Sequence, residues 1–160
     1  MVVVAIAVVV VAVGVLARRP KTTPPPAVVP VETSRTYRVF FTNDLLDPDV
    51  TCQTVFPIVR DTNYEGDLGR AAIEDLVRGP TAADRLAGYG TALPTGVTIK
   101  SLELKDGSLK IDLSSELDRV GGSCRVSLIR KQIEETAKAL SGVGSVTISV
   151  EGRTDDILQP

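Results

Sequence analysis

Apolar and polar residues alternate with a period of two where the globular part of the chain begins. Tyr37, Val39 and Phe41 share one face of this segment. Such alternation is typical of a β-strand with one buried face. A second strand is predicted over residues 55–59, and because Pro57 cannot donate a ladder hydrogen bond, this strand should lie at the edge of a sheet.

The apolar positions then change to a helical period. In residues 65–80 they recur every three or four positions, which predicts an amphipathic helix with Asp67 as its N-cap. Gly79 is expected in the left-handed conformation after the last turn, and Pro80 prevents the helix from continuing. Thr81 can then cap a short helical turn over residues 82–88.

The clearest local signal is a hairpin over residues 97–113. Asp106 and Gly107 stand between two β-like runs and predict a two-residue type I′ turn, because both turn residues need a positive φ. The alternation slips within the first run. We therefore expect a β-bulge near Lys100 or Ser101.

A second long helix is predicted after residues 121–123. Ser123 is its expected cap, and Gly142 or Gly144 is expected to end it. The apolar stripe of this helix is Val126, Ile129, Ile133, Ala137 and Leu140. A final strand begins at residue 145. The order β-β-α-β-β-α-β predicts an α+β fold, a two-layer sandwich in which two helices cover one face of a mainly antiparallel sheet.

Three regions are expected along the chain. Residues 1–17 are an apolar run that contains no charged side chain. This run predicts a signal anchor or transmembrane helix. Such a run spans roughly 25 Å, near the lower limit for crossing a bilayer. Residues 18–35 are a Pro-rich linker, and residues 36–160 form the globular domain.

The side of the membrane on which the domain lies is open to two interpretations. Arg18, Arg19 and Lys21 follow the apolar run, and the positive-inside rule then favours a cytoplasmic domain. A Pro-rich stalk and a cysteine pair that can be oxidised favour export of the domain. We therefore expect the domain outside the cytoplasm. Val15 to Ala17 make an imperfect cleavage site, so a cleaved, secreted form is the weaker alternative.

Composition removes several kinds of chemistry. The chain contains no histidine, which excludes Ser-His-Asp and Cys-His nucleophiles, HExxH zinc sites and His acid–base catalysis. The globular part is mildly acidic and poor in aromatic residues, so nucleic acid is not an expected partner. The glycines of residues 90–98 fit neither a phosphate loop nor a dinucleotide fingerprint. Residues 44–49 resemble a calcium loop only in composition, so no metal or cofactor is expected.

Carboxylates are the remaining candidates for catalysis. A pair drawn from them could serve a small glycan hydrolase of the cell wall. The glutamates and aspartates considered are Glu74, Asp75, Asp112, Glu116 and Asp118. Glu74 and Asp75 are expected on the solvated face of a helix, and Asp112 is expected to point outward from a strand. No catalytic residue is therefore assigned, and the hydrolase is kept as an alternative together with an ion- or ligand-binding module.

The chain has two cysteines, Cys52 and Cys124. In an exported domain they can form a disulfide, whereas in a reducing compartment they would be two free thiols. Their spacing is not that of a C-x-x-C redox pair.

Several short motifs, in their order along the chain, resemble the GerMN domain family of sporulation and spore germination. The resemblance covers about residues 36–155. The motifs are Leu76-Val77-Arg78-Gly79-Pro80-Thr81, Leu93-Pro94-x-Gly96, Asp112-Leu113-Ser114, Gln132-Ile133-x-x-Thr136 and Val150-Glu151-Gly152. The chain departs from the family at Leu117, where Phe is common, and at Ala137, where Leu is common.

The resemblance implies a fold similar to the ring-building motifs of secretion assemblies and a module without an active site. It also implies an extracytoplasmic location, with a signal anchor or lipid as tether. We therefore expect a non-catalytic, membrane-tethered interaction domain that contacts envelope proteins, peptidoglycan or a second copy of itself. The residues given structural roles are Gly79, Pro80, Thr81, Pro94, Gly96, Asp106, Gly107 and Gly152.

Overall fold

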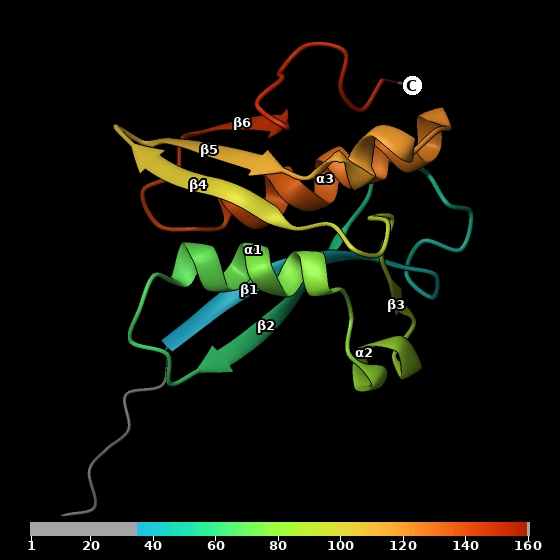
Figure 1. The fold of residues 1–160 in the computed structure, drawn as a ribbon. Helices are drawn as coiled ribbons and strands as arrows, with labels where there is room; N and C mark the ends of the chain where they lie inside the picture. Colours follow the sequence, from blue (N-terminus) through green and yellow to red (C-terminus); the bar gives the residue numbers. More distant parts are fainter. Residues whose placement is uncertain (1–34, 160) are drawn as a thin grey trace, which may run out of the picture. The chain divides into compact units, whose positions relative to one another are not determined.

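A computed structural model describes residues 35–159 of the chain (Figure 1). The expected anchor at residues 1–17, with its apolar helix, and the linker up to residue 34 lie outside the described residues. Within residues 35–159, no helix combines the length and apolar character that crossing a membrane requires.

The described chain contains six strands, three α-helices and one 3-10 helix. In chain order they are β1 (Arg35–Asn43), β2 (Phe56–Thr62), α1 (Leu68–Arg78), α2 (Ala82–Leu86), β3 (Tyr89–Gly90), β4 (Ile99–Lys105), β5 (Ser108–Leu113), the 3-10 helix η1 (Ser115–Arg119), α3 (Ser123–Lys138) and β6 (Ser145–Val150). The fold is α+β. Beyond the expected order, it contains the short strand β3 and the 3-10 helix η1.

The strands form two sheets, and the expectation of a single sheet was wrong. One sheet has the order β2-β1-β3 and the other has the order β4-β5-β6. β2 is therefore an edge strand, as Pro57 indicated. The second sheet pairs β5 with β6 in parallel, and α3 connects these two strands. Alternation showed that each strand buries one face, but not which distant strand would pair with it.

The two long helices lie between the sheets rather than on one face of a single sheet. α1 and α3 contact each other and β1, while α1 also contacts β4 and α3 also contacts β6. Figure 1 shows α1 between the β4–β5 hairpin and the strands β1 and β2. A helix in this position buries side chains in both directions, which explains why both sheets can remain small.

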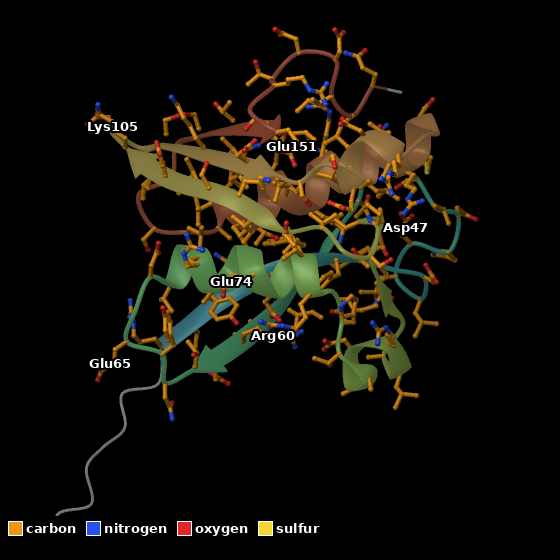
Figure 2. The ribbon with its side chains drawn as sticks, in the orientation of Figure 1. Asp47, Arg60, Glu65, Glu74, Lys105 and Glu151 are labelled. Atoms are coloured by element: carbon orange, nitrogen blue, oxygen red, sulfur yellow. A yellow bond between two sulfur atoms is a disulfide. The ribbon has the colours of Figure 1, made fainter. Side chains whose placement is uncertain are left out.

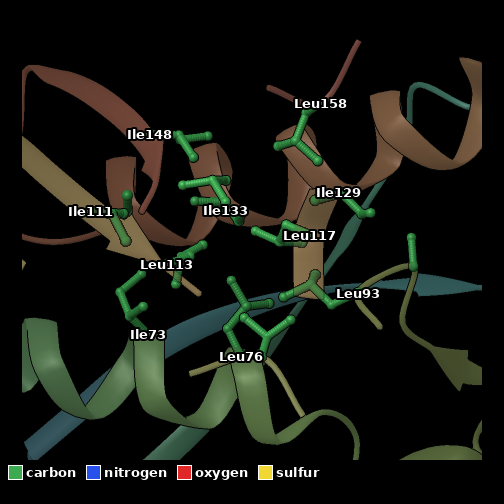
Figure 3. Packing of buried hydrophobic residues seen from close by; sticks show 14 of the residues in the cluster. Ile73, Leu76, Leu93, Ile111, Leu113, Leu117, Ile129, Ile133, Ile148 and Leu158 are labelled. Atoms are coloured by element: carbon green, nitrogen blue, oxygen red, sulfur yellow. The ribbon is translucent and has the colours of Figure 1, made fainter. Parts of the chain in front are cut away.

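The core joins all three layers. Figure 3 shows Ile73 and Leu76 of α1 facing Leu113 and Leu117, with Ile133 of α3 beyond them. Val39 and Phe41 of β1 are fully buried on the other side of the helices. The inner faces of both sheets and the helical stripes therefore form one hydrophobic cluster.

Most of the local predictions for the turns are correct. Asp106 and Gly107 have φ values of 50° and 78°, as a type I′ turn requires. The β4–β5 register shifts between Ile99 and Ser101, where the bulge was expected. Pro94 precedes the turn at Gly96, whose φ is 88°.

The ends of the helices differ from the predictions in three places. Gly79 has a positive φ of 82°, but its ψ of 177° is extended rather than left-handed helical. Ser123 is the first residue of α3 and makes no capping hydrogen bond, because Gly122 occupies the N-cap position. α3 ends at Lys138, so both Gly142 and Gly144 lie beyond its end.

Candidate functional site

A cluster of charged side chains joins β2, α1 and α2. Arg60 on β2 is labelled in Figure 2. Its guanidinium donates to Asp75 of α1 at 2.9 Å and to Asp84 of α2 at 2.6 Å. Asp75 and Asp84 are only 5% and 9% exposed. Asp75 was expected on a solvated face of the helix, which is wrong, because Arg60 from β2 reaches over that face. The two carboxylates are thus part of the interior, whereas the Arg60 side chain is 19% exposed.

The Gly79-Pro80-Thr81 turn brings the two aspartates to the same arginine. Thr81 caps α2, and both its main-chain N–H and its hydroxyl donate to Asp84 at 2.7 Å. The hydrogen bond from Arg60 is the main cause that holds the pKa of Asp84 well below its usual range, and those from Thr81 add to it. This motif therefore positions a structural ion cluster.

Gln132 and Thr136 on α3 form hydrogen bonds to the main chain at one edge of β1. The Phe40 N–H donates to the Thr136 hydroxyl at 3.0 Å, and the Gln132 amide donates to the Phe40 carbonyl at 3.3 Å. Gln132 also accepts from the Ala92 N–H at 2.8 Å. Both side chains are 0% exposed. They replace the hydrogen bonds that a longer β3 would supply, so this motif also has a structural role.

The carboxylates considered for hydrolysis do not have the properties of a catalytic pair. Asp112 accepts from the Ser149 hydroxyl at 2.6 Å and the Gly152 N–H at 2.8 Å, and these bonds lower its pKa. The pKa of Glu116 is also lowered, chiefly by a hydrogen bond from Ser114. A glycosidase needs one carboxyl group with a raised pKa as its general acid. Neither group meets this requirement.

The other acidic candidates are engaged by arginines. Asp118 pairs with Arg153 at 2.6 Å, and Glu74 pairs with Arg70 at 3.4 Å. Within residues 35–159, no three His, Cys, Asp or Glu side chains are grouped so that they could hold a metal ion. Asp47, in the stretch compared with a calcium loop, accepts from the Thr51 N–H and hydroxyl instead.

The loop between β1 and β2 has features of a binding loop. These strands are antiparallel neighbours, a connection for which two to five residues usually suffice, yet the loop has twelve residues, 44–55. Long loops without secondary structure in a compact domain are usually functional. The length of this loop therefore requires an explanation other than chain reversal.

Both ends of the loop are fastened to the domain. Asn43, only 3% exposed, accepts from the N–H groups of Leu45 and Leu46 and donates to the Ala87 carbonyl at 3.1 Å. At the other end, a disulfide joins Cys52 to Cys124 of α3, with the two Cα atoms 4.9 Å apart. The loop is consequently attached to Ala87, just after α2, at one end and to α3 at the other.

This fastened loop exposes leucines. Leu45 is 72% exposed and Leu46 is 59% exposed, and Leu86 at the end of α2 is 90% exposed. Leu45 lies against the residues that follow Leu86, because a Cβ added to Gly88 would stand 2.7 Å from the Leu45 Cγ. We call these three leucines the apolar tip. Grouped exposed apolar side chains are typical of interaction sites.

The composition of residues 44–49 indicated only a weak likeness to a calcium loop and did not reveal the apolar tip. Two adjacent leucines in a loop rich in aspartate were the available signal, since such a loop has no strand or helix face on which to bury them. The approach of Leu45 to Gly88, two residues after Leu86, could not be seen, because it depends on how the residues after α2 lie beside the end of β1.

A groove of about 340 Å³ lies at the Arg35 end of β1. We call it the terminal groove. Its apolar lining residues are Tyr37, Leu68, Leu102, Leu104, Leu109, Ala139, Leu140 and Val143. Arg35 and Asp67 supply its charged groups. It opens where the β4–β5 hairpin passes the start of α1.

Comparisons with known proteins agree on one family. The family model Germane, described as "Sporulation and spore germination", matches residues 38–156. No curated protein gives a significant match.

Two solved structures from Bacillus subtilis share the fold. The tandem GerMN domains of the sporulation protein GerM match with 20% identity and a TM-score of 0.58, covering 81% of this chain. This chain spans only 43% of that tandem-domain protein. The first GerMN domain of GerM matches with 14% identity and a TM-score of 0.58, covering 75% of this chain and 85% of the matched one.

Proposed function

This chain belongs to the Germane (GerMN) family of sporulation and spore germination domains, and we propose on that basis that it is a non-catalytic interaction domain of the bacterial cell envelope. It binds a protein or the cell wall through its surface rather than transforming a substrate. The observation that carries this function is the apolar tip, where three leucines are 59% to 90% exposed on a fastened loop and a neighbouring helix.

The polar interior supports the same function. The buried Asp75, Asp84, Gln132 and Thr136 side chains bond to the half-buried Arg60 or to the main chain of the domain. Groups used in this way are not available to a substrate. The lowered pKa values of Asp112 and Glu116 argue against the cell-wall hydrolase alternative.

We place the domain outside the cytoplasm, with residues 1–17 as its membrane anchor and residues 18–35 as a spacer. The Cys52–Cys124 disulfide supports this location, since disulfides persist mainly in oxidising compartments. In intact cells, both cysteines should resist alkylation until a reductant is added. Alkylation without a reductant would contradict the location.

In-cell photo-crosslinking tests the binding function. A photoreactive side chain at Leu86 should yield a discrete crosslinked product, because this position is 90% exposed in the apolar tip. Val59, 61% exposed on β2, is the matched control and should not yield that product. Leu45→Ser together with Leu46→Ser should abolish the Leu86 product. If the product formed equally from Val59, or survived the serine substitutions, the apolar tip would not be the binding surface.

A further inference from the structure

We propose that the Cys52–Cys124 disulfide is a site of thiol–disulfide exchange, at which the thiolate of an external dithiol attacks Cys52 and Cys124 leaves. The partner is a dithiol oxidoreductase, and the same path in reverse forms the bond. This inference goes beyond the proposed function and does not depend on what the apolar tip binds. It follows from the different surroundings of the two cysteines.

Access to the bond is from the Cys52 side. A surface cavity of about 340 Å³ is lined by Cys52 but not by Cys124, and we call it the disulfide cavity. Figure 1 shows the loop after β1 beside the first turn of α3, to which the disulfide joins it. One face of α3 supplies most of the remaining lining of the cavity, namely Ser127, Arg130, Lys131 and Glu134. An approaching thiol therefore meets Cys52 first.

The disulfide cavity has an excess of positive charge. Glu134 pairs with Lys138 at 3.1 Å. By contrast, neither Arg130 nor Lys131 belongs to an ion pair within residues 35–159. Arg130 instead donates to two main-chain carbonyls. The attacking species in thiol–disulfide exchange is a thiolate anion, so these two cations favour its approach.

Cys124 is placed to be the leaving group. It is the second residue of α3, a helix of sixteen residues. No side chain caps this helix, because Gly122 occupies the N-cap position, so the first N–H groups of α3 remain available to a thiolate. The helix dipole favours negative charge at the same place. Cys52 lies in the loop of residues 44–55, outside any helix. Exchange is faster when the departing thiolate is the better stabilised one, which here is that of Cys124.

The loop backbone beside the bond is strained. Val50 and Cys52 have φ values of 46° and 62°, in the left-handed region that non-glycine residues rarely adopt. Opening the disulfide would let this segment relax. Strained or exposed disulfides are reduced more easily than unstrained, buried ones. The backbone therefore favours exchange at this bond.

The reaction balances in two steps. In the first, a bond forms between the attacking sulfur and the Cys52 Sγ, and the bond between the two cysteines breaks. Its electron pair stays on the Cys124 Sγ, which takes a proton from water. In the second, the other thiolate of the dithiol displaces Cys52, which is protonated in turn, and closes the dithiol's own disulfide. The domain gains two electrons and two protons, and the dithiol is oxidised.

Trapping the first step tests which cysteine is attacked. The oxidised full chain is mixed with reduced glutathione, a monothiol, and quenched at early times with a thiol-alkylating agent. Peptide mass spectrometry then maps both groups. Glutathione on Cys52 with the alkyl group on Cys124 should exceed the reverse pattern at least about tenfold. Equal amounts of the two patterns, or glutathione mainly on Cys124, would overturn the inference.

A charge variant tests the route through the disulfide cavity. Lys131→Gln should slow exchange with glutathione roughly twofold, because one charge beside the path is lost. Exchange with 2-mercaptoethanol, which carries no carboxylate, should slow less. Lys110→Gln is the matched control, since Lys110 is an exposed lysine on β5 outside the cavity, and it should react like the parent. Both lysines are exposed, so both variants should fold, and circular dichroism would verify this. Equal rates for the two variants would also overturn the inference.

Discussion

Arg60 joins three elements through one guanidinium, and it shows how a residue on an edge strand can hold two helices. Its partners Asp75 and Asp84 are both nearly buried, so their charges are stabilised by the arginine rather than by water. Residue spacing predicted the helix that carries Asp75, but not this contact. The contact depends on β2 pairing with β1, against which α1 packs, and a periodic pattern does not encode this arrangement.

Arg60→Ala should lower the free energy of unfolding by about 3 kcal/mol, because the nearly buried Asp84 would lose its cation and Asp75 would keep only the exposed Arg78, 3.0 Å away. Arg70→Ala is the matched control, since Arg70 and Glu74 are about half exposed and such pairs contribute less than about 1 kcal/mol. Guanidinium unfolding of both variants measures the difference. Equal losses would show that the cluster has no special role.

Acid should destabilise the domain through Asp84. Its pKa is depressed in the folded state, so the contribution of the carboxylate is complete above its unfolded pKa of about 3.9 and is lost as the pH falls below that value. Asp84→Asn should therefore weaken the dependence of unfolding free energy on pH between about pH 4 and pH 2. Asp112, whose pKa is also lowered, should retain part of that dependence. Parallel curves for variant and parent would contradict this assignment.

At the scale of elements, local patterns predicted the strands, the long helices and the turns, because these depend on neighbours in sequence. The bulge between Ile99 and Ser101 and the Asp106-Gly107 turn are examples. The division into two sheets was not predictable in this way. It depends on Gln132 and Thr136 of α3 occupying the edge of β1, where a further strand could otherwise pair.

Gly79→Ala should destabilise the domain by roughly 1 to 3 kcal/mol, because φ 82° with ψ 177° is a conformation almost restricted to glycine. Space is not the cause, since an added Cβ would meet the Thr91 Cγ2 at an ordinary 3.6 Å. Gly121→Ala is the control. Gly121 has no positive φ and nothing within 4 Å of an added Cβ, so its loss should be small. Thermal unfolding that affected both variants equally would refute the backbone explanation.

At the scale of the whole molecule, the Cys52–Cys124 disulfide joins the long loop to the helix in the middle layer. The two cysteines were recognisable as a pair from their number, and the structure connects them. The surface that the disulfide helps to hold was not recognisable, because Leu45, Leu46 and Leu86 come from segments whose proximity arises only in the folded chain. The candidate site is therefore largely a product of tertiary structure.

Removing the disulfide by Cys52→Ser and Cys124→Ser should lower the unfolding free energy by roughly 4 kcal/mol in the chain-entropy view, since the bridged positions are 72 residues apart. Denaturant unfolding measures the loss. The photoreactive side chain at Leu86 should also give a more heterogeneous set of crosslinked products, because one end of the loop is released. A double variant as stable as the parent would mean that the closed loop constrains the unfolded chain little.

The course of β1 across the domain has a mechanical consequence. The preceding chain enters β1 at Arg35, and the apolar tip follows the other end of this strand. A force that pulls the tip away from the preceding chain therefore acts along β1. The β1–β2 hydrogen bonds lie across that line and would be loaded in shear, together rather than one after another. The Thr136 and Gln132 bonds to Phe40 would share the load from the opposite edge. β1 is thus placed to transmit tension from the tip to the preceding chain without being peeled from its sheet.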